Sequence, residues 1–201
     1  MKSYNKTGTA DIEEGIFVSF CGNNITPVEN CFDDLYNDGF VGKAYLLYTD
    51  FDSNDGYGNI TNSKDQCRKL AEKFWDKFCK NNPVKPRGDL NLVYGNETEG
   101  DRVFTIFMTG EQNFNLDYVL SRIIKIYTEN NNKKMHFNIT NGNQVFTCAI
   151  AIAAHMVGGA LHYVDKGKKD YEATRCIKDC DAPSAYDLSK PEWNILKQIG
   201  T

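Results

Sequence analysis

Residues 136–165 read HFNITNGNQVFTCAIAIAAHMVGGALHYVD, and this stretch contains a long apolar run between two short ones. The short runs, Met135–Ile139 and Ala160–Val164, combine aromatic and aliphatic residues over about five positions, as buried strands do. The longer run, Gln144–Val157, has the length of a helix. A strand, a helix and a second strand in this order form a βαβ unit, which predicts two parallel strands joined by a crossover helix.

The same alternation extends toward the N-terminus. Further strands are predicted at Ile16–Cys21, Lys43–Tyr48, Leu90–Tyr94 and Val103–Met108, of which the last two form either a hairpin or an extension followed by a core strand. Further helices are predicted from Thr26, as N-cap, to Asp38, at Ser63–Lys80 and at Asn113–Glu129, with a polar loop at Asp50–Asn62. The pattern predicts an α/β fold: a Rossmann-like three-layer sandwich with a mainly parallel central sheet.

The chain divides into three parts in this interpretation. Residues 1–14 form a flexible lead-in, residues 15–165 one ligand-binding domain, and residues 166–201 a linker and the start of a helix. That helix is indicated by a capping box, Ser189-x-x-Glu192, ahead of Trp193. Because so short a helix is unstable alone, it docks on the domain or on a partner, or it begins a further domain absent from this chain, such as a truncated winged helix.

Charge and hydropathy exclude some classes of function. The net charge of −4 over 201 residues disfavours non-specific nucleic-acid binding, but it leaves room for a local basic pocket that takes a small anion. The apolar run Val145–Leu161 has about the length of a short membrane span. Because it contains Thr147, His155 and two glycines, we expect a buried helix instead. With no signal peptide visible, a cytoplasmic protein without a membrane partner is expected.

The sequence contains seven cysteines and three histidines, which are residue types that can bind metals or act in catalysis. Most cysteines lie among apolar residues, so reduced buried thiols are expected. Cys176 and Cys180 are spaced C-x3-C, either as a local disulfide or as two free thiols, and no second Cys/His pair stands at metal-ligand spacing. His136 and His162 fall on neighbouring predicted strands and are expected to be packed or hydrogen-bonded. We therefore expect neither a metal nor a cofactor.

Two strand-to-helix turns carry the candidate site, because ligands of open parallel sheets bind beyond the carboxyl ends of the strands. The first turn follows the first strand and supplies Ser19, Phe20, Gly22, Asn23 and Asn24. Gly22 lets a ligand approach the backbone closely, and the two asparagines supply amide groups. The alternative to a ligand-binding role is a purely structural one, in which these small turn residues only end the strand.

The second turn precedes the long apolar helix and supplies Thr140, Asn141, Gly142, Asn143 and Gln144. Backbone N–H groups at a helix N-terminus form an anion site, and the density of polar side chains exceeds what capping alone requires. Neither turn is a G-x-G-x-x-G or G-x-x-x-x-G-K-[ST] motif, so the sequence lacks the best-supported signatures of an NAD-binding or ATP-binding site.

The segment His136–Asp165 resembles the fourth strand, ligand loop and following helix of CARF domains (CRISPR-associated Rossmann fold), and it is similar to the sensor domains of archaeal winged-helix regulators. The family motif N-x-[ST]-G-G-[TN]-K falls on Asn138 to Gln144. Phe17–Asn24 and Ala44–Tyr48 stand where the family has its first two strands. The resemblance covers residues 15–165.

The resemblance implies a homodimer that binds a cyclic oligoadenylate, or a related nucleotide signal, across its two-fold axis. It further implies a sensor in antiviral defence or transcription regulation, which touches DNA only through a domain absent from this chain. Two positions depart from the motif: Asn141 replaces a glycine, and Gln144 replaces the lysine. Since Gln144 lacks a positive charge and Ser19 lacks a nearby base, no catalytic residue is predicted. The alternatives are a ring nuclease or other phosphodiesterase that uses the same loops, and a ligand-free dimerisation module.

Overall fold

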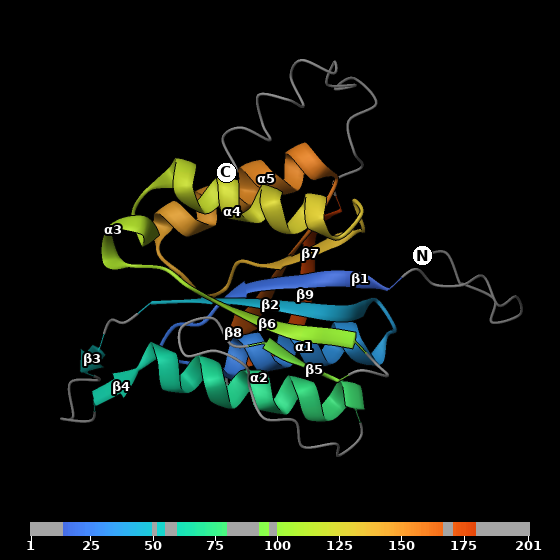
Figure 1. The fold of residues 1–201 in the computed structure, drawn as a ribbon, viewed down its shortest axis with the longest axis horizontal. Helices are drawn as coiled ribbons and strands as arrows, with labels where there is room; N and C mark the ends of the chain where they lie inside the picture. Colours follow the sequence, from blue (N-terminus) through green and yellow to red (C-terminus); the bar gives the residue numbers. More distant parts are fainter. Residues whose placement is uncertain are drawn as a thin grey trace, which may run out of the picture.

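The computed structural model describes residues 14–49, 52–54, 60–79, 93–96, 100–166 and 171–179. A seven-stranded sheet lies between two layers of helices (Figure 1), and its strand order is β5-β6-β2-β1-β7-β8-β9. The predicted Rossmann-like three-layer sandwich with a mainly parallel sheet is thereby confirmed.

Five strands form the parallel part of the sheet: β1 Gly15–Phe20, β2 Val41–Tyr48, β6 Gly100–Phe107, β7 Met135–Asn138 and β8 Ala160–Lys166. The edge strands, β5 Val93–Asn96 and β9 Tyr171–Asp179, pair antiparallel with their neighbours. Of the two arrangements predicted for β5 and β6, the structure therefore shows the hairpin. Every residue of β1 is buried, because helices cover both faces of the central strand.

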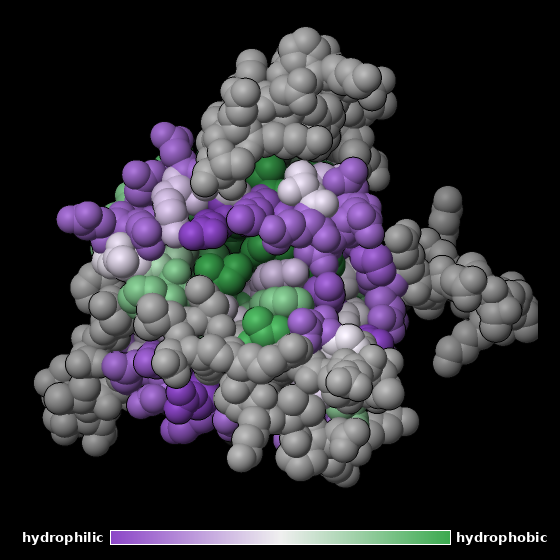
Figure 2. All heavy atoms as spheres, in the orientation of Figure 1, coloured by the Kyte–Doolittle hydropathy of each residue, from purple (hydrophilic) through white to green (hydrophobic). Residues whose placement is uncertain are grey.

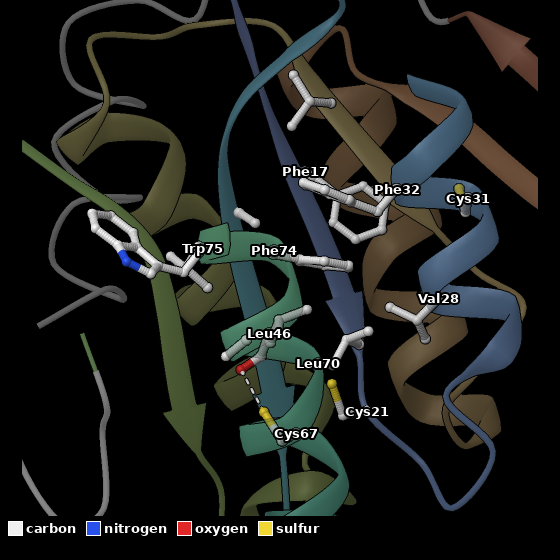
Figure 3. Packing of buried hydrophobic residues seen from close by; sticks show 14 of the residues in the cluster. Phe17, Cys21, Val28, Cys31, Phe32, Leu46, Cys67, Leu70, Phe74 and Trp75 are labelled. Carbon is white, nitrogen blue, oxygen red and sulfur yellow. Dashed lines mark hydrogen bonds between the residues drawn. The ribbon is translucent and has the colours of Figure 1, made fainter. Parts of the chain in front are cut away.

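The helices divide between the two faces of the sheet (Figure 1). α1 Thr26–Asn37 and α2 Ser63–Cys79 cover one face, and α3 Gly110–Asn113, α4 Leu116–Glu129 and α5 Gln144–Val157 lie on the other. Alternate strand residues face the two cores, so Phe17 belongs to the α1/α2 core and Val18 to the α4/α5 core. Figure 3 shows the first core, where the Phe32 and Phe74 rings stack with centroids 3.6 Å apart.

Three local predictions need correction. Helix α1 begins at Thr26, so Ile25 rather than Thr26 is the N-cap, and the side-chain Oδ1 of Asn24 accepts a hydrogen bond from the Thr26 N–H (3.1 Å). The helix predicted at Asn113–Glu129 begins only at Leu116, as α4, because Asn115 caps it by accepting from the Tyr118 N–H (3.0 Å), and Asn113 instead ends the separate short helix α3.

The third correction concerns the predicted loop at Asp50–Asn62. Within it, β3 Asp52–Asn54 and β4 Ile60–Asn62 form a small antiparallel sheet of their own. Strand β9 was not predicted either; it lies in the segment 166–201 and pairs with β8 from Ala160 to Lys166. The tail Ser189–Ile199, with its expected helix start, lies outside the described residues, as do Asp50 and Cys180.

In the described part of the chain, no helix combines the length and the apolar character needed to cross a bilayer. The helix α5 agrees in both bounds with the sequence prediction, and it buries one face against the sheet and α4 through Phe146, Ala149, Ile150, Ala153 and Ala154.

Candidate functional site

Three loops meet at the carboxyl ends of the parallel strands. We name them the β1 loop (residues 21–25), the β6 loop (residues 108–115) and the β7 loop (residues 139–143). The β7 loop connects the other two: Asn141 Nδ2 donates to the carbonyl oxygen of Asn24 (2.6 Å), and Asn143 Nδ2 donates to the carbonyl oxygen of Asn113 (3.0 Å). The structure thus brings together the two turns that the sequence indicated, and it adds a third loop.

The β7 loop is held in place by its own polar side chains. Asn143 caps α5 by accepting from the Phe146 N–H (2.8 Å), while Thr140 Oγ1 accepts from the Val164 N–H (2.8 Å). Gly142 has φ +115°, and a Cβ built on it would lie 2.6 Å from Phe146 Cδ1. Only glycine fits this turn, because both its conformation and its proximity to a buried ring exclude a side chain.

Ser19 and Phe20 lie beneath these loops rather than on them. The Ser19 side chain is fully buried, and its hydroxyl accepts from Asn138 Nδ2 (3.2 Å) and donates to the Phe20 carbonyl (3.4 Å). The Phe20 ring is buried against Phe146, with centroids 5.1 Å apart. These two side chains therefore support the loops from the core and do not reach the surface.

The other predicted site residues lie at or near the surface. The exposed ones are Asn23, Asn24, Gly142 and Gln144, and the half-buried ones are Gly22, Thr140, Asn141 and Asn143. Around Gly22 there is open space, since a Cβ built there would meet no atom within 4 Å. The β1 loop is further fixed to the start of α2, because the Ser63 hydroxyl donates to the Cys21 carbonyl oxygen (2.6 Å).

The site is built from neutral dipoles. Across the three loops, Glu111 is the one residue with a formal charge at neutral pH. The positive charge that an anion requires comes instead from the N-terminus of α5, whose first backbone N–H groups lie directly after the β7 loop. Such a site can bind and orient an anion, but these loops contribute no histidine or lysine that could transfer a proton.

Asn113 belongs to the site although the sequence analysis did not include it. It ends the short helix α3, its side chain is 5% exposed, and its Oδ1 has no hydrogen-bond partner. A buried acceptor left unpaired costs about 1–3 kcal/mol, so Asn113 is a further candidate residue of the site. The capping box of Thr109 and Gln112, which starts α3, was the sequence signal that could have identified this loop.

Two of the three histidines form a buried pair. Nδ1 of His136 and Nε2 of His162 lie 3.1 Å apart in a buried hydrogen bond between β7 and β8. The prediction of packed, hydrogen-bonded histidines on neighbouring strands is confirmed. In the described ranges, no group of three or more His, Cys, Asp or Glu side chains is arranged to hold a metal ion.

Four of the cysteines are buried, namely Cys21, Cys31, Cys67 and Cys79, whereas Cys148 and Cys176 are exposed. Burial raises the pKa of the Cys67 thiol well above its ordinary value, and it raises that of Cys31 in the same direction. Both thiols therefore stay protonated at neutral pH and are poor nucleophiles.

Comparison with known proteins gave structural neighbours only. No protein-family model matches the sequence, and no curated protein matches it. Can2 from Sulfobacillus thermosulfidooxidans, solved in complex with cyclic tetra-adenylate, has a TM-score of 0.45 and 13% identity over 83% of this chain and 38% of its own.

Two further solved structures are similar. A type III CRISPR defence DNA nuclease activated by cyclic oligoadenylate has a TM-score of 0.43 and 15% identity over 83% of this chain and 21% of its own. Enterococcus italicus Csm6, bound to cyclic hexa-2′-fluoro-hexa-dAMP, has a TM-score of 0.47 and 10% identity over 80% of this chain and 36% of its own. The chain thus covers between 21% and 38% of the length of these proteins. The chain is similar in fold to a part of each of these three proteins.

Proposed function

We propose that this chain is a ligand-sensing domain that holds a cyclic oligoadenylate, or a closely related nucleotide signal, over its β1 and β7 loops and controls an attached domain. The observation that carries the proposal is the 2.6 Å hydrogen bond from Asn141 Nδ2 to the Asn24 carbonyl. It joins the two turns that the family resemblance assigns to the ligand, and it places both at the carboxyl ends of adjacent strands.

The chemistry of the loops suits a nucleotide. Phosphate oxygens are acceptors, which the N–H groups at the start of α5 can serve. Adenine presents both donors and acceptors at its edges, and asparagine and glutamine amides can match both. Asn23, Asn24 and Gln144 are exposed and supply such amides. Affinity in this proposal comes from several neutral hydrogen bonds and the helix dipole rather than from ion pairs.

A second copy of the chain completes the proposed site. The outward face of α5 is a stripe of exposed residues: Gln144, Cys148, Ala151, Ile152 and His155. Ile152 is 40% exposed, and small side chains on either side of it permit close helix contact. Because the stripe starts at Gln144, a two-fold dimer through this face would set two β7 loops next to one axis. A ligand that contacts both copies could then shift the dimer between two arrangements.

Binding is favoured over hydrolysis. Ring cleavage needs a group that activates a ribose hydroxyl or stabilises the leaving oxygen. The Ser19 hydroxyl is buried and hydrogen-bonded, and the lysine of the family motif is replaced by Gln144. A sensor that retains its ligand therefore fits these residues better than a phosphodiesterase does.

The proposal is tested by isothermal calorimetry of the whole chain with cyclic tri-, tetra- and hexa-adenylate, cyclic dinucleotides, AMP, ATP and NAD. We expect one cyclic oligoadenylate to bind saturably. Asn141→Asp removes the donor that joins the loops and adds a charge that repels phosphate, so affinity should fall by at least about tenfold. Lys69→Gln, an equal change of charge on the exposed side of α2, should leave the affinity unchanged.

The outcomes separate the three hypotheses. A folded chain that binds none of these nucleotides contradicts the sensor, and if that chain is dimeric, a dimerisation module remains. Linear oligoadenylates that accumulate during incubation would instead establish an enzyme. Sedimentation of Ile152→Asp, on the exposed stripe of α5, tests the dimer separately, because a buried carboxylate should convert the dimer to monomers.

A further inference from the structure

The β7 loop contains a pair of residues with a chemistry of its own, Asn141 followed by Gly142. It is the one Asn-Gly pair in the 201-residue sequence. The loop lies where α5 begins, at one end of the helix layer that α5 forms with α4 (Figure 1). Figure 2 shows hydrophilic side chains over α4, so this layer faces water. Since Gly142 is exposed and Asn141 is half-buried, water has access to the pair.

An Asn-Gly pair can rearrange without an enzyme. The Gly142 backbone nitrogen loses its proton and attacks the Asn141 side-chain carbon Cγ, which closes a five-membered succinimide ring. The N–Cγ bond forms, the Cγ–Nδ2 bond breaks, and Nδ2 leaves as ammonia with that proton. Water then opens the ring at either carbonyl and gives aspartate or isoaspartate, so one water is consumed for each ammonia released. Glycine favours ring closure because it has no side chain to obstruct the attack.

The groups that react at Asn141 are held by few hydrogen bonds. Within the residues that the structure describes, the Gly142 N–H donates to no acceptor, and Asn141 Oδ1 accepts from no donor. The leaving nitrogen, Nδ2, makes one hydrogen bond, to the Asn24 carbonyl oxygen (2.6 Å). The side chain of Asn143 makes two, from the Phe146 N–H and to the Asn113 carbonyl oxygen. Ring closure therefore breaks one side-chain hydrogen bond at Asn141 and would break two at Asn143.

The fold itself requires the glycine of the pair. Gly142 has φ +115°, and a Cβ built on it would lie 2.6 Å from Phe146 Cδ1. A bulkier residue, which would slow ring closure, is therefore excluded at this position. Residue 141 is the half of the pair that the turn leaves free to vary, and it is an asparagine where the family motif has a glycine.

The products change the loop in two ways. A carboxylate oxygen in place of Nδ2 cannot donate to the Asn24 carbonyl oxygen, so the hydrogen bond between the β1 and β7 loops is lost. The new charge also lies shortly before Gln144, where the positive end of the α5 dipole attracts it. Isoaspartate has the same charge and adds a methylene group to the backbone of the turn. Both products therefore place a fixed negative charge at the position proposed for an anionic ligand.

We propose that Asn141 is a deamidation site, and that its spontaneous conversion to aspartate or isoaspartate separates the β1 and β7 loops and closes the candidate site to anions. The modification depends on the Asn141–Gly142 pair alone, whereas its effect on nucleotide binding rests on the proposed function. The chain thereby loses its ligand gradually with age, because no step of the conversion restores the amide.

The modification is tested by incubating the whole folded chain at neutral and mildly alkaline pH and mapping its peptides by mass spectrometry. Asn141 should convert at least about tenfold faster than Asn24 and Asn143, the internal controls from the same loops. The rate should rise with pH, because the deprotonated nitrogen is the nucleophile. The chain unfolded in urea shows the reactivity of the pair without the fold. Conversion only in the unfolded chain, or equal rates at the three asparagines, would overturn the proposal.

A variant and a binding measurement test the consequence. Asn141→Gln keeps an amide but would need a six-membered ring, so the modified form should not accumulate, with the unfolding temperature measured to confirm folding. Anion exchange separates the more acidic modified chain, which should bind cyclic oligoadenylate at least about tenfold more weakly than the unmodified fraction. Equal affinity of the two fractions would refute closure of the site. If the unmodified fraction binds no nucleotide, the sensor proposal fails, whereas the mass spectra still decide the modification.

Discussion

The two ends of one parallel sheet use different chemistry in this protein. At the carboxyl ends, the β1, β6 and β7 loops are joined by asparagine amides and contain one charged residue, Glu111. At the amino ends, a cavity of about 370 Å³ beside the C-terminus of α4 is lined by lysine, arginine and carboxylate side chains. The difference follows from the helices. Helix α5 begins beside the β7 loop, so its positive dipole end faces that site, whereas α4 ends at Glu129 beside this cavity.

Gly142→Ala should have the largest effect at the carboxyl end. The new Cβ would meet Phe146 Cδ1 at 2.6 Å, in a backbone conformation with φ +115° that alanine rarely adopts. We expect a loss of about 2–3 kcal/mol in the free energy of unfolding, together with loss of nucleotide binding. Urea denaturation measures the first effect. The control for stability is Gly22→Ala, where nothing lies within 4 Å, and a comparable loss in its free energy of unfolding would contradict this account.

Asn130→Ala should have the next largest effect, at the amino end. The buried Asn130 side chain donates to the Tyr45 hydroxyl (2.9 Å) and the Ile126 carbonyl oxygen (2.7 Å) and accepts from Lys43. Removing it leaves these groups without their partner and should cost about 2 kcal/mol. The control for stability is Thr128→Ala, two residues before Asn130 at a half-buried position of α4. If the two ends are independent, Asn130→Ala leaves nucleotide affinity at the loops unchanged, and a parallel loss would contradict the separation.

Asn143 has two roles that substitutions can separate: it caps α5, and it donates a hydrogen bond to the β6 loop. Asn143→Ala removes the cap of α5 and should cost about 1 kcal/mol, as should Asn115→Ala, the matched cap of α4. Asn143→Asp keeps an acceptor for the Phe146 N–H but loses the donor to the Asn113 carbonyl. We expect it to be nearly as stable as the unmodified chain yet impaired in nucleotide binding, which thermal unfolding and calorimetry on one sample would establish. Unimpaired binding would show that the link to the β6 loop is dispensable.

The smallest effect is a dependence on alkaline pH that arises in β2, the strand shared by both regions. Burial raises the pKa of Tyr48 from 10.0 to about 12 and raises that of Tyr45. A folded-state pKa above the unfolded one means that the neutral phenol contributes stability below pH 10 and that this contribution is lost as the pH rises through about 12. The unfolding temperature should therefore fall between pH 10 and 12, and less steeply in Tyr48→Phe. An identical slope in that variant would refute the assignment to Tyr48.

Local signals explain which parts of the fold could be predicted. Helix α5 was predicted with both bounds because an apolar run, a polar N-cap at Asn143 and a glycine at the C-cap lie close together in the sequence. The β7 loop was identified for the same reason. Strand β9 was not predicted, because it pairs with β8 across a bulged antiparallel ladder and has no regular apolar alternation of its own. The start of α4 was placed three residues too early because Asn113 and Asn115 are both residues that can cap a helix, and the apolar stripe that begins at Leu116 does not distinguish them.

The sequence by itself determined the alternation of the main strands and helices from β1 to β8, the parallel core and the polar turn that begins α5, since each depends on residues a few positions apart. Only the tertiary structure decided that Ser19 and Phe20 support the loops from the core and that Asn143 reaches Asn113. It also decided that residues as far apart in the sequence as Glu14 and Lys133 line one cavity. Those arrangements join segments 30 to more than 100 positions apart. Their distances are set by how the two helix layers pack on the sheet, and no local pattern of residues encodes that packing.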